Sequence, residues 1–276
     1  MGECMFIFRL LRRLVLIICI ILGAIYAYDA YQSYQGTNRV SKAHTTVEQT
    51  IEKNEDTLSR WERIYRMLTF KEKVEIALYQ RVSKDTWVKS DVIPDNAKRA
   101  LIAIEDKRYY KHGAIDVLGV SRALYVNAVA GETVEGGSTI TQQLVKNLFL
   151  SSKRIMSRKV EEVFLAYLME HYYSKDEIIT MYLNTIYYGT DYYGIKAASE
   201  GYFKTEPKDL NLSQAAVLAG IPQAPSYFNP VSNIDATKQR QRTVLTLMAQ
   251  QGIISYADID KAYYKRLDAP KKQENH

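Results

Sequence analysis

The stretch Gly136-Gly-Ser-Thr-Ile-Thr-Gln-Gln-Leu-Val-Lys-Asn147 joins a glycine pair to two hydroxyl side chains, a pattern typical of the start of a helix. Gln143, Lys146 and Asn147 stand at positions i, i+3 and i+4, so a helix places them on one face. That face offers a cation and two amides to one polar ligand, and a phosphate suits the cation. Alone, the pattern more often marks ordinary capping and a solvated surface. The sequence around it decides between the two interpretations.

Four further blocks flank this stretch. They are Glu105-Asp-Lys-Arg-Tyr-Tyr-Lys-His-Gly-Ala-Ile-Asp116 upstream and, downstream, Arg158-Lys-Val-Glu-Glu-Val-Phe-Leu-Ala-Tyr-Leu-Met-Glu170, Lys175-Asp-Glu-Ile-Ile-Thr-Met-Tyr-Leu-Asn184 with Gly189, and Arg240-Gln-Arg-Thr-Val-Leu-Thr-Leu-Met248. In this order, the five blocks resemble the family 51 glycosyltransferases. These are the peptidoglycan polymerases that occur as monofunctional enzymes and as the first domain of class A penicillin-binding proteins. The resemblance runs from about Asp91 to Met248, and it is specific because five blocks agree in order.

Local patterns predict a domain made of helices. Before Glu105, apolar residues recur at i, i+3, i+4 and i+7, which predicts an amphipathic helix. These positions are Ala97, Ala100, Leu101 and Ile104. Ser174 with Glu177 forms a capping-box pattern at the start of another helix, and no series of alternating strands is present. The sequence therefore predicts an all-α domain. The resemblance implies a lysozyme-like helical domain with a long cleft, and the N-terminal residues predict that a membrane anchor helix precedes it.

The amino-terminal segment predicts that anchor. Arg9, Arg12 and Arg13 precede an uncharged run over 14–28, and Asp29 ends it. Basic residues stay cytoplasmic, so we expect a single-pass helix in a bacterial cell membrane, with its N-terminus in the cytoplasm and the catalytic domain on the extracytoplasmic face. A cleaved signal peptide is the alternative, since an apolar core of about 7 to 15 residues also fits the run. No small-x-small cleavage site follows the run, which favours the anchor.

Three segments follow from these patterns. We expect a cytoplasmic stub and transmembrane anchor over 1–36, a stalk and helical spacer over 37–90, and the glycosyltransferase domain over 91–276. In the spacer, apolar residues at helical spacing predict a spacer or packing helix rather than a partner-binding site. They are Leu58, Trp61, Ile64, Tyr65 and Leu68. Both cysteines, Cys4 and Cys19, precede the stalk, so no disulfide is expected in the outer domain.

The formal net charge of the chain is +6. A basic chain suits nucleic acid, an anionic membrane or an anionic substrate. Export and the lack of any recognised nucleic-acid module exclude nucleic acid as a partner. Together with the resemblance, the charge predicts as partners lipid II and the growing glycan chain, the membrane, and cell-wall synthesis proteins.

Glu105 is the first expected catalytic residue. Joining sugars from a lipid pyrophosphate donor needs a base for the acceptor hydroxyl and positive charge for the departing pyrophosphate. The resemblance implies that Glu105 removes a proton from the 4-hydroxyl of the incoming lipid-linked disaccharide, with the growing chain as donor, in an inverting β-1,4 transfer. A glutamate at a helix end is otherwise usually solvated, and the block around Glu105 favours catalysis.

Glu162 is the second expected catalytic residue. The resemblance places it beside the donor pyrophosphate, where it would orient basic residues, assist departure or hold a divalent ion. It lies four residues after Arg158, so a helix salt bridge is the alternative. The residues that correspond to the family's substrate contacts are the cations Lys146, Arg154 and Arg158 and the polar side chains Ser138, Thr139, Gln142, Gln143 and Asn147.

Two other polar residues are expected to serve the structure. Asp106 would support the local fold, and His112 would be a structural hydrogen-bonding residue rather than a proton carrier. No histidine and cysteine cluster has metal-ligand spacing. The sequence therefore requires no cofactor, and a Mg²⁺ or Mn²⁺ at the pyrophosphate is left open.

The segment 114–130 is apolar with few charges and lies between the two chemical blocks. Core packing explains this composition. The resemblance suggests instead that the segment contacts the outer leaflet, where a lipid-carried substrate would enter.

Two alternatives to the polymerase are a lysozyme-like lytic hydrolase and a non-catalytic cell-wall synthesis scaffold. A hydrolase would use Glu105 as an acid but would not need cations for a pyrophosphate. A scaffold would need neither glutamate. Retention of both glutamates and of the cations favours the peptidoglycan glycosyltransferase, an inverting hexosyltransferase.

Overall fold

The computed structural model describes residues 59–132, 136–150 and 156–267. The predicted anchor and nearly all of the predicted stalk lie outside these ranges. No helix within them has both the length and the apolar character needed to cross a membrane.

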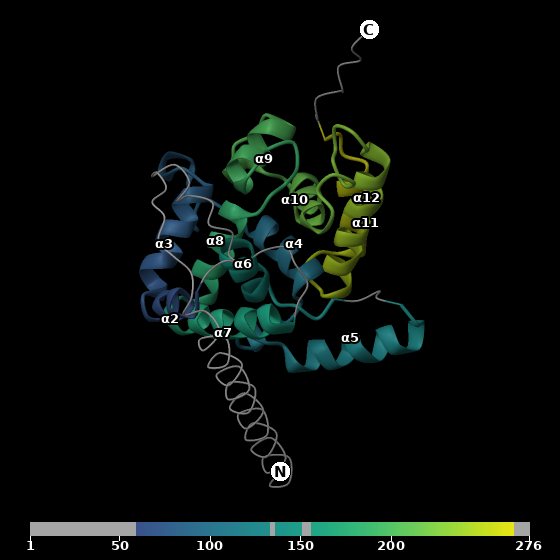
Figure 1. The fold of residues 1–276 in the computed structure, drawn as a ribbon. Coiled ribbons are helices and arrows are strands. Elements are labelled where there is room, and N and C mark those ends of the chain that lie inside the picture. The colour runs from purple at the N-terminus through teal and green to yellow at the C-terminus, as the bar shows by residue number, and fades with distance from the viewer. Residues whose placement is uncertain (1–58, 133–135, 151–155, 268–276) are drawn as a thin grey trace. The chain divides into compact units, whose positions relative to one another are not determined.

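The described residues form helices (Figure 1). The α-helices are α2 (Arg60–Leu68), α3 (Phe70–Arg81), α4 (Asp95–Glu105), α5 (Val117–Ala130), α6 (Ile140–Phe149), α7 (Met156–Tyr172), α8 (Lys175–Thr185), α9 (Gly194–Phe203), α10 (Leu212–Gly220), α11 (Ile234–Gln250) and α12 (Tyr256–Tyr263). Short 3-10 helices are η3 (Lys84–Thr86), η4 (Tyr109–Lys111), η5 (Pro207–Asp209) and η6 (Ile221–Gln223). Within the described ranges there is no strand, and Tyr187 and Tyr193 form an isolated bridge. The all-α prediction is confirmed.

The chain divides into two compact units, Met1–Tyr65 and Arg66–His276. The second unit contains α3, whose residues Phe70, Val74 and Leu78 are buried in the same hydrophobic core as the later helices. The predicted boundary at residues 90 and 91 stays a prediction. Part of the predicted spacer is therefore a packing helix of this unit.

Three helices predicted from local patterns begin or end where expected. α4 ends at Glu105 and buries the face that carries Ala97, Ala100 and Leu101. A capping box of Thr139 and Gln142 starts α6, and one of Ser174 and Glu177 starts α8. These signals act within four to eight residues, which is why the sequence shows them directly.

The core lies around α10, all of whose residues from Ser213 to Gly220 are buried. α10 packs against α4 and α11, and α6 packs against α7 and α8. Figure 1 shows α4 and α6 in the middle of this unit. The helix that ends at Glu105 and the helix that carries Gln143 are therefore held by packing on several sides.

α5 is largely exposed, and it extends away from the other helices of its unit along one edge of Figure 1. Its buried residues are Gly119 and Ala123. The large apolar side chains on its surface are Val117, Leu118, Leu124, Tyr125 and Val129. α5 approaches the segment before α6 at Gly137, where a Cβ atom would lie 3.1 Å from the Cα of Val120. Core packing therefore does not account for the apolar composition of 114–130.

Candidate active site

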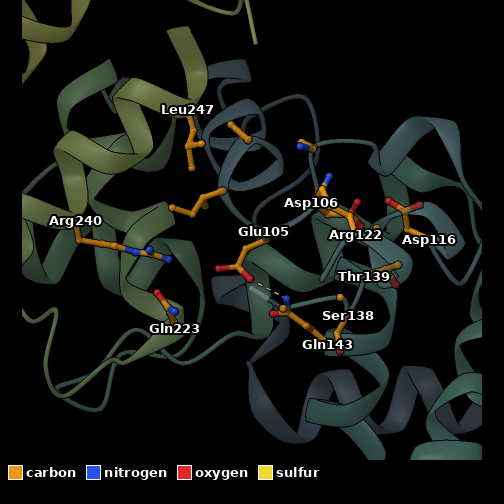
Figure 2. A pocket seen from close by; sticks show the side chains of 16 residues that line it. Glu105, Asp106, Asp116, Arg122, Ser138, Thr139, Gln143, Gln223, Arg240 and Leu247 are labelled. Carbon is orange, nitrogen blue, oxygen red and sulfur yellow. Dashed lines mark hydrogen bonds between the residues drawn. The ribbon is translucent and has the colours of Figure 1, made fainter. Parts of the chain in front are cut away.

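A pocket of about 450 Å³ lies where the end of α4 meets α5, the segment before α6, and α11 (Figure 2). Its wall consists of Ala103, Ile104, Glu105, Asp106, Lys107, Asp116, Gly119, Arg122, Gly136, Gly137, Ser138, Thr139, Gln143, Gln223, Arg240 and Leu247. Four residues predicted from the sequence as site residues meet here: Glu105, Ser138, Thr139 and Gln143. The structure therefore combines the glutamate of one sequence block with polar side chains of the next.

Glu105 is half-buried at the end of α4 and is oriented by Gln143 of α6. The Gln143 Nε2 amide donates a hydrogen bond of 2.8 Å to Glu105 Oε2 (Figure 2). Gln143 Oε1 in turn accepts a hydrogen bond of 2.9 Å from the Tyr182 hydroxyl on α8. Because an ionised carboxylate only accepts, the amide nitrogen faces Glu105 and the amide oxygen faces the Tyr182 hydroxyl, which donates to it. A chain of three side chains from three helices therefore positions the carboxylate.

The pKa of Tyr182 is raised well above its ordinary value, first because the phenol is buried and second because of the nearby charge of Glu105. The hydroxyl therefore stays protonated throughout the pH range in which proteins function. Tyr182 remains a donor to Gln143 whenever Glu105 is ionised. Sequence analysis had placed Tyr182 in the fourth block without assigning it a role.

Arg240 lies across the pocket from Glu105 in Figure 2. Burial lowers the pKa of Arg240, and the charge of Glu105 opposes that effect. The guanidinium still stays charged, because arginine does not lose its proton in proteins. Arg122 of α5 and Gln223 of η6 also line the pocket and were not predicted. Arg240 is the first residue of the fifth block, so the sequence could have identified it as a site residue. No local pattern marks Arg122 or Gln223.

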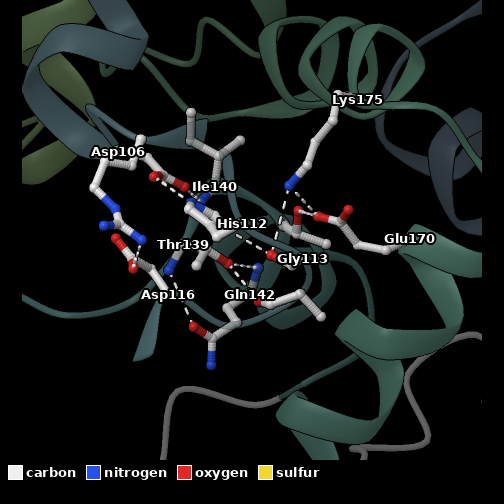
Figure 3. A network of polar contacts seen from close by, with 12 residues as sticks. Asp106, His112, Gly113, Asp116, Thr139, Ile140, Gln142, Glu170 and Lys175 are labelled. Atoms are coloured by element: carbon white, nitrogen blue, oxygen red, sulfur yellow. Dashed lines mark hydrogen bonds and ion pairs between the residues drawn. The ribbon is translucent and has the colours of Figure 1, made fainter. Parts of the chain in front are cut away.

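His112 and Asp106 form a polar network next to Glu105 (Figure 3). His112 Nε2 lies 2.7 Å from Asp106 Oδ1, and His112 Nδ1 lies 2.6 Å from the Gly113 carbonyl oxygen. Asp106 Oδ2 accepts a hydrogen bond of 3.1 Å from the Ile140 backbone N–H, the first residue of α6. Burial lowers the pKa of His112, but the bonds to Asp106 and Gly113 outweigh it, so the pKa is raised. Both ring nitrogens face oxygen acceptors, which agrees with the expected structural role.

Asp106, His112 and Asp116 bring three ligand-type atoms within 4.8 Å of one another. Asp116 forms an ion pair of 2.9 Å with Arg108. With a protonated histidine, these four side chains form two ion pairs with no net charge. The residues therefore fit a salt-bridge network better than a divalent metal. A Mg²⁺ or Mn²⁺ at the pyrophosphate stays a separate proposal.

Thr139 and Gln142 make their hydrogen bonds within the fold. The Thr139 hydroxyl donates 2.9 Å to the Ala114 carbonyl and accepts from the Gln142 backbone N–H. Gln142 Oε1 accepts 3.0 Å from the Thr139 backbone N–H, and Gln142 does not line the pocket. Their predicted contacts with substrate stay predictions. In the structure these two side chains set the start of α6.

Lys146 and Asn147 lie further along α6 and do not line the pocket that contains Glu105. Lys146 is exposed and Asn147 is half-buried. Arg154, the other cation favoured for the pyrophosphate, lies outside the described residues. The predicted grouping of Lys146 with Arg154 therefore stays a prediction.

Glu162 is buried on α7 and forms an ion pair with Lys159, three residues earlier. Lys159 Nζ also donates 3.2 Å to the Ser138 hydroxyl, which lies in the pocket wall. Arg158, the partner considered from the spacing of four, is half-buried on the same helix. Lys159 thus joins the second predicted glutamate to the pocket. Lys159 was not predicted as a site residue, although its place in the third block beside Arg158 was a usable signal.

A protein-family model described as Transglycosylase matches residues 72–249. The match covers more than half of the chain and includes every residue of the pocket described above. The chain belongs to the transglycosylase family. The resemblance expected from the five blocks is therefore confirmed. The lysozyme-like cleft stays what that resemblance implies for this transglycosylase.

Several curated proteins are similar to this transglycosylase. Penicillin-binding protein 1F of Bacillus subtilis (strain 168) is 51% identical over 163 residues, which cover 59% of this chain and 23% of the relative. Penicillin-binding protein 1A/1B of the same organism is 49% identical over 180 residues, covering 65% and 20%. The crystal structure of penicillin-binding protein 1A from Haemophilus influenzae has a TM-score of 0.41 and 24% identity, covering 68% of this chain and 18% of that one. The transglycosylase chain thus spans roughly a fifth of the length of these relatives.

Proposed function

We propose that this transglycosylase is a bacterial peptidoglycan glycosyltransferase that polymerises lipid II into β-1,4-linked glycan strands and releases the lipid pyrophosphate. The observation that carries the proposal is the position of Glu105. Its carboxylate lies in a pocket of about 450 Å³ and is held by the amide of Gln143. Membership of the transglycosylase family supports the reaction class.

Glu105 acts as the general base in this proposal. It removes the proton from the 4-hydroxyl of the lipid II acceptor as that oxygen attacks C1 of the donor sugar. The bond between C1 and the pyrophosphate oxygen breaks, and its electron pair leaves with the pyrophosphate. Attack from the opposite face turns an α-linked donor into a β-1,4 product. The hydrogen bond from Gln143 engages Oε2 and holds the carboxylate in one orientation.

The departing pyrophosphate needs positive charge. We assign this role to Lys146 and Arg154, with Arg158 nearby in sequence, and we add Lys159 because it joins Glu162 to Ser138. Arginine can bind phosphate oxygens in a bidentate manner, and lysine supplies a point charge. Glu162 would then orient Lys159 rather than carry the proton. Ser138, Gln143 and Asn147 would bind sugar or phosphate oxygens.

The proposal also includes a membrane. The substrate carries a lipid, and the exposed apolar residues of α5 suit contact with the outer leaflet. The predicted single-pass anchor would keep the N-terminus in the cytoplasm and the catalytic domain on the extracytoplasmic face of the bacterial cell membrane. Cell-wall synthesis proteins are the further partners proposed.

The test is polymerisation of purified lipid II by the detergent-solubilised full chain, with products resolved by length. Wild type is compared with Glu105→Gln and with Glu206→Gln, a control at an exposed glutamate remote in sequence from the site. We expect long glycan from wild type and control. Glu105→Gln should keep the same melting temperature and lose at least about 100-fold in turnover, the scale of general-base catalysis.

The alternatives give different products. A folded wild type that makes no polymer, with and without added Mg²⁺ or Mn²⁺, would favour the non-catalytic scaffold. Shortening of preformed glycan would favour the lytic hydrolase. Full polymerase activity in Glu105→Gln would leave the reaction class standing and remove Glu105 as its base.

A further inference from the structure

The C-terminal end of α6 is capped by two arginines from outside the helix. The last four carbonyl groups of a helix lack partners within it. In α6 the Asn147 carbonyl accepts a hydrogen bond from the Arg81 side chain, and the Phe149 carbonyl accepts one of 3.0 Å from Arg66 Nη1. Cations at this end also suit the helix dipole. The helix that carries Lys146 therefore ends against two guanidinium groups.

Arg66 contacts a second helix as well. Its Nη2 atom forms an ion pair with Glu161 of α7, and its guanidinium carbon lies 5.6 Å from the centre of the Phe149 ring. The side chain of Arg66 is 9% exposed and that of Glu161 is 2% exposed. A single buried guanidinium thus connects the end of α6 with the first half of α7.

The two connected helices carry the residues proposed for the pyrophosphate. Lys146 lies one turn before Phe149 on α6, and Glu162 directly follows Glu161 on α7. Lys159 lies two residues before Glu161. A change in how α6 meets α7 would therefore change the distance between Lys146 and the pair of Lys159 and Glu162.

We propose that Arg66 is a positioning residue of the donor side of the site, which fixes the end of α6 against α7 and so sets the spacing between Lys146 and the pair of Lys159 and Glu162. The inference rests on the proposed function and adds a residue to it. Arg66 lies before residue 72, where the match to the transglycosylase family model begins. Arg81 is the natural comparison, because it caps α6 without the ion pair to α7.

A buried ion pair also affects stability, so the test must separate the two effects. Removing one member of a buried ion pair is in general strongly destabilising. Replacing both partners by apolar residues of similar volume is often neutral or stabilising. The double substitution Arg66→Met with Glu161→Met therefore removes the link between the helices without leaving half of the ion pair behind, and its remaining cost is the lost donor to the Phe149 carbonyl.

The experiment compares full-length wild type, Arg66→Met with Glu161→Met, Arg66→Lys, and Arg99→Met as a control at an exposed arginine of α4. Each is assayed for kcat and KM with lipid II well below its melting temperature. We expect the double variant to melt within a few degrees of wild type and to lose about 10-fold in kcat/KM, mainly through KM. Arg66→Lys keeps the charge but lacks the planar guanidinium that reaches both partners. Its kcat/KM should therefore lie between that of wild type and that of the double variant. Wild-type kinetics in a folded double variant would overturn the inference.

Two further outcomes remain decisive. If the double variant does not fold, the KM of Arg66→Lys for lipid II tests the inference. A raised KM supports it, and a wild-type KM overturns it. If wild-type protein does not polymerise lipid II, the proposed function fails separately, and amide hydrogen exchange then tests the positioning alone. Faster exchange at residues 147–150 in variants of matched stability supports a link by Arg66, and unchanged exchange there refutes it.

Discussion

Gln143 can orient Glu105 because the Tyr182 hydroxyl holds the other end of its amide. Tyr182→Phe removes that hydroxyl and leaves Gln143 Oε1 without its donor. An unpaired buried acceptor costs about 1–3 kcal/mol, and Gln143 can lower that cost by moving Oε1 towards water, which weakens the hydrogen bond from Nε2 to Glu105. We expect Tyr182→Phe to lower kcat roughly 10-fold, which corresponds to about 1.4 kcal/mol.

Tyr110→Phe is the matched control for this prediction. The Tyr110 hydroxyl donates 2.8 Å to Asp176, and Tyr110 is exposed and does not line the pocket that contains Glu105. Tyr110→Phe removes one phenolic hydroxyl, as Tyr182→Phe does, and the variant should keep the kcat of wild type. Equal loss in both variants would mean that the effect comes from general destabilisation.

The His112 network gives a pH dependence of stability. The raised pKa of His112 lies above the unfolded value of about 6.5, since Asp106 and Gly113 bind the protonated ring more strongly than burial disfavours it. The folded state therefore binds the proton more tightly. The resulting stabilisation is complete below the unfolded pKa and is lost as pH rises through the folded pKa.

Thermal melting of wild type and His112→Gln from pH 5.5 to 9 measures this effect. We expect the advantage of wild type to shrink as pH rises above about 6.5, the unfolded value. The imidazole resonances should titrate above that value as well. A difference in melting temperature that does not change with pH would show that His112 contributes its packing and not its charge.

At the scale of elements, α5 carries large apolar side chains on its exposed surface. Leu124 and Tyr125 are 66% and 72% exposed. An apolar side chain moved from water into lipid gains about 1.5–3 kcal/mol when fully buried. We expect Leu124→Ser to lower co-sedimentation of residues 59–276 with lipid vesicles about 10-fold. Tyr256→Ser, at a 66% exposed tyrosine of α12, is the control and should not change it. Equal vesicle binding by wild type and Leu124→Ser would argue against membrane contact by α5.

Local signals predicted elements well but did not predict which face is covered. The capping boxes of α6 and α8 and the apolar face of α4 appear where the spacing indicated. In α2 the apolar residues Trp61 and Leu68 are 70% and 79% exposed, while Arg66 is buried. Helical periodicity predicted the helix, but burial depended on Glu161, 95 residues away in the chain.

At the scale of the whole molecule, the position of α3 predicts where the domain can be shortened. Phe70, Val74 and Leu78 are almost fully buried, and each such side chain contributes about 1.5–3 kcal/mol. Domains are typically stable by only about 5–15 kcal/mol. We expect residues 59–276 to unfold cooperatively on heating and residues 91–276 to lose that transition. A cooperative, equally stable fragment 91–276 would instead support the boundary predicted from sequence.

Sequence alone established the helical class, the end of α4, the start of α6 and the transglycosylase family. Periodicity, capping and ordered motifs act over a few residues, or recur as blocks, and so are visible without coordinates. Only the tertiary structure decided that Arg240 faces Glu105, that Lys159 joins Glu162 to Ser138, and that Arg66 joins α6 to α7. Those contacts depend on which helices pack together, because Lys159 and Ser138, and Arg66 and Phe149, lie far apart in the chain.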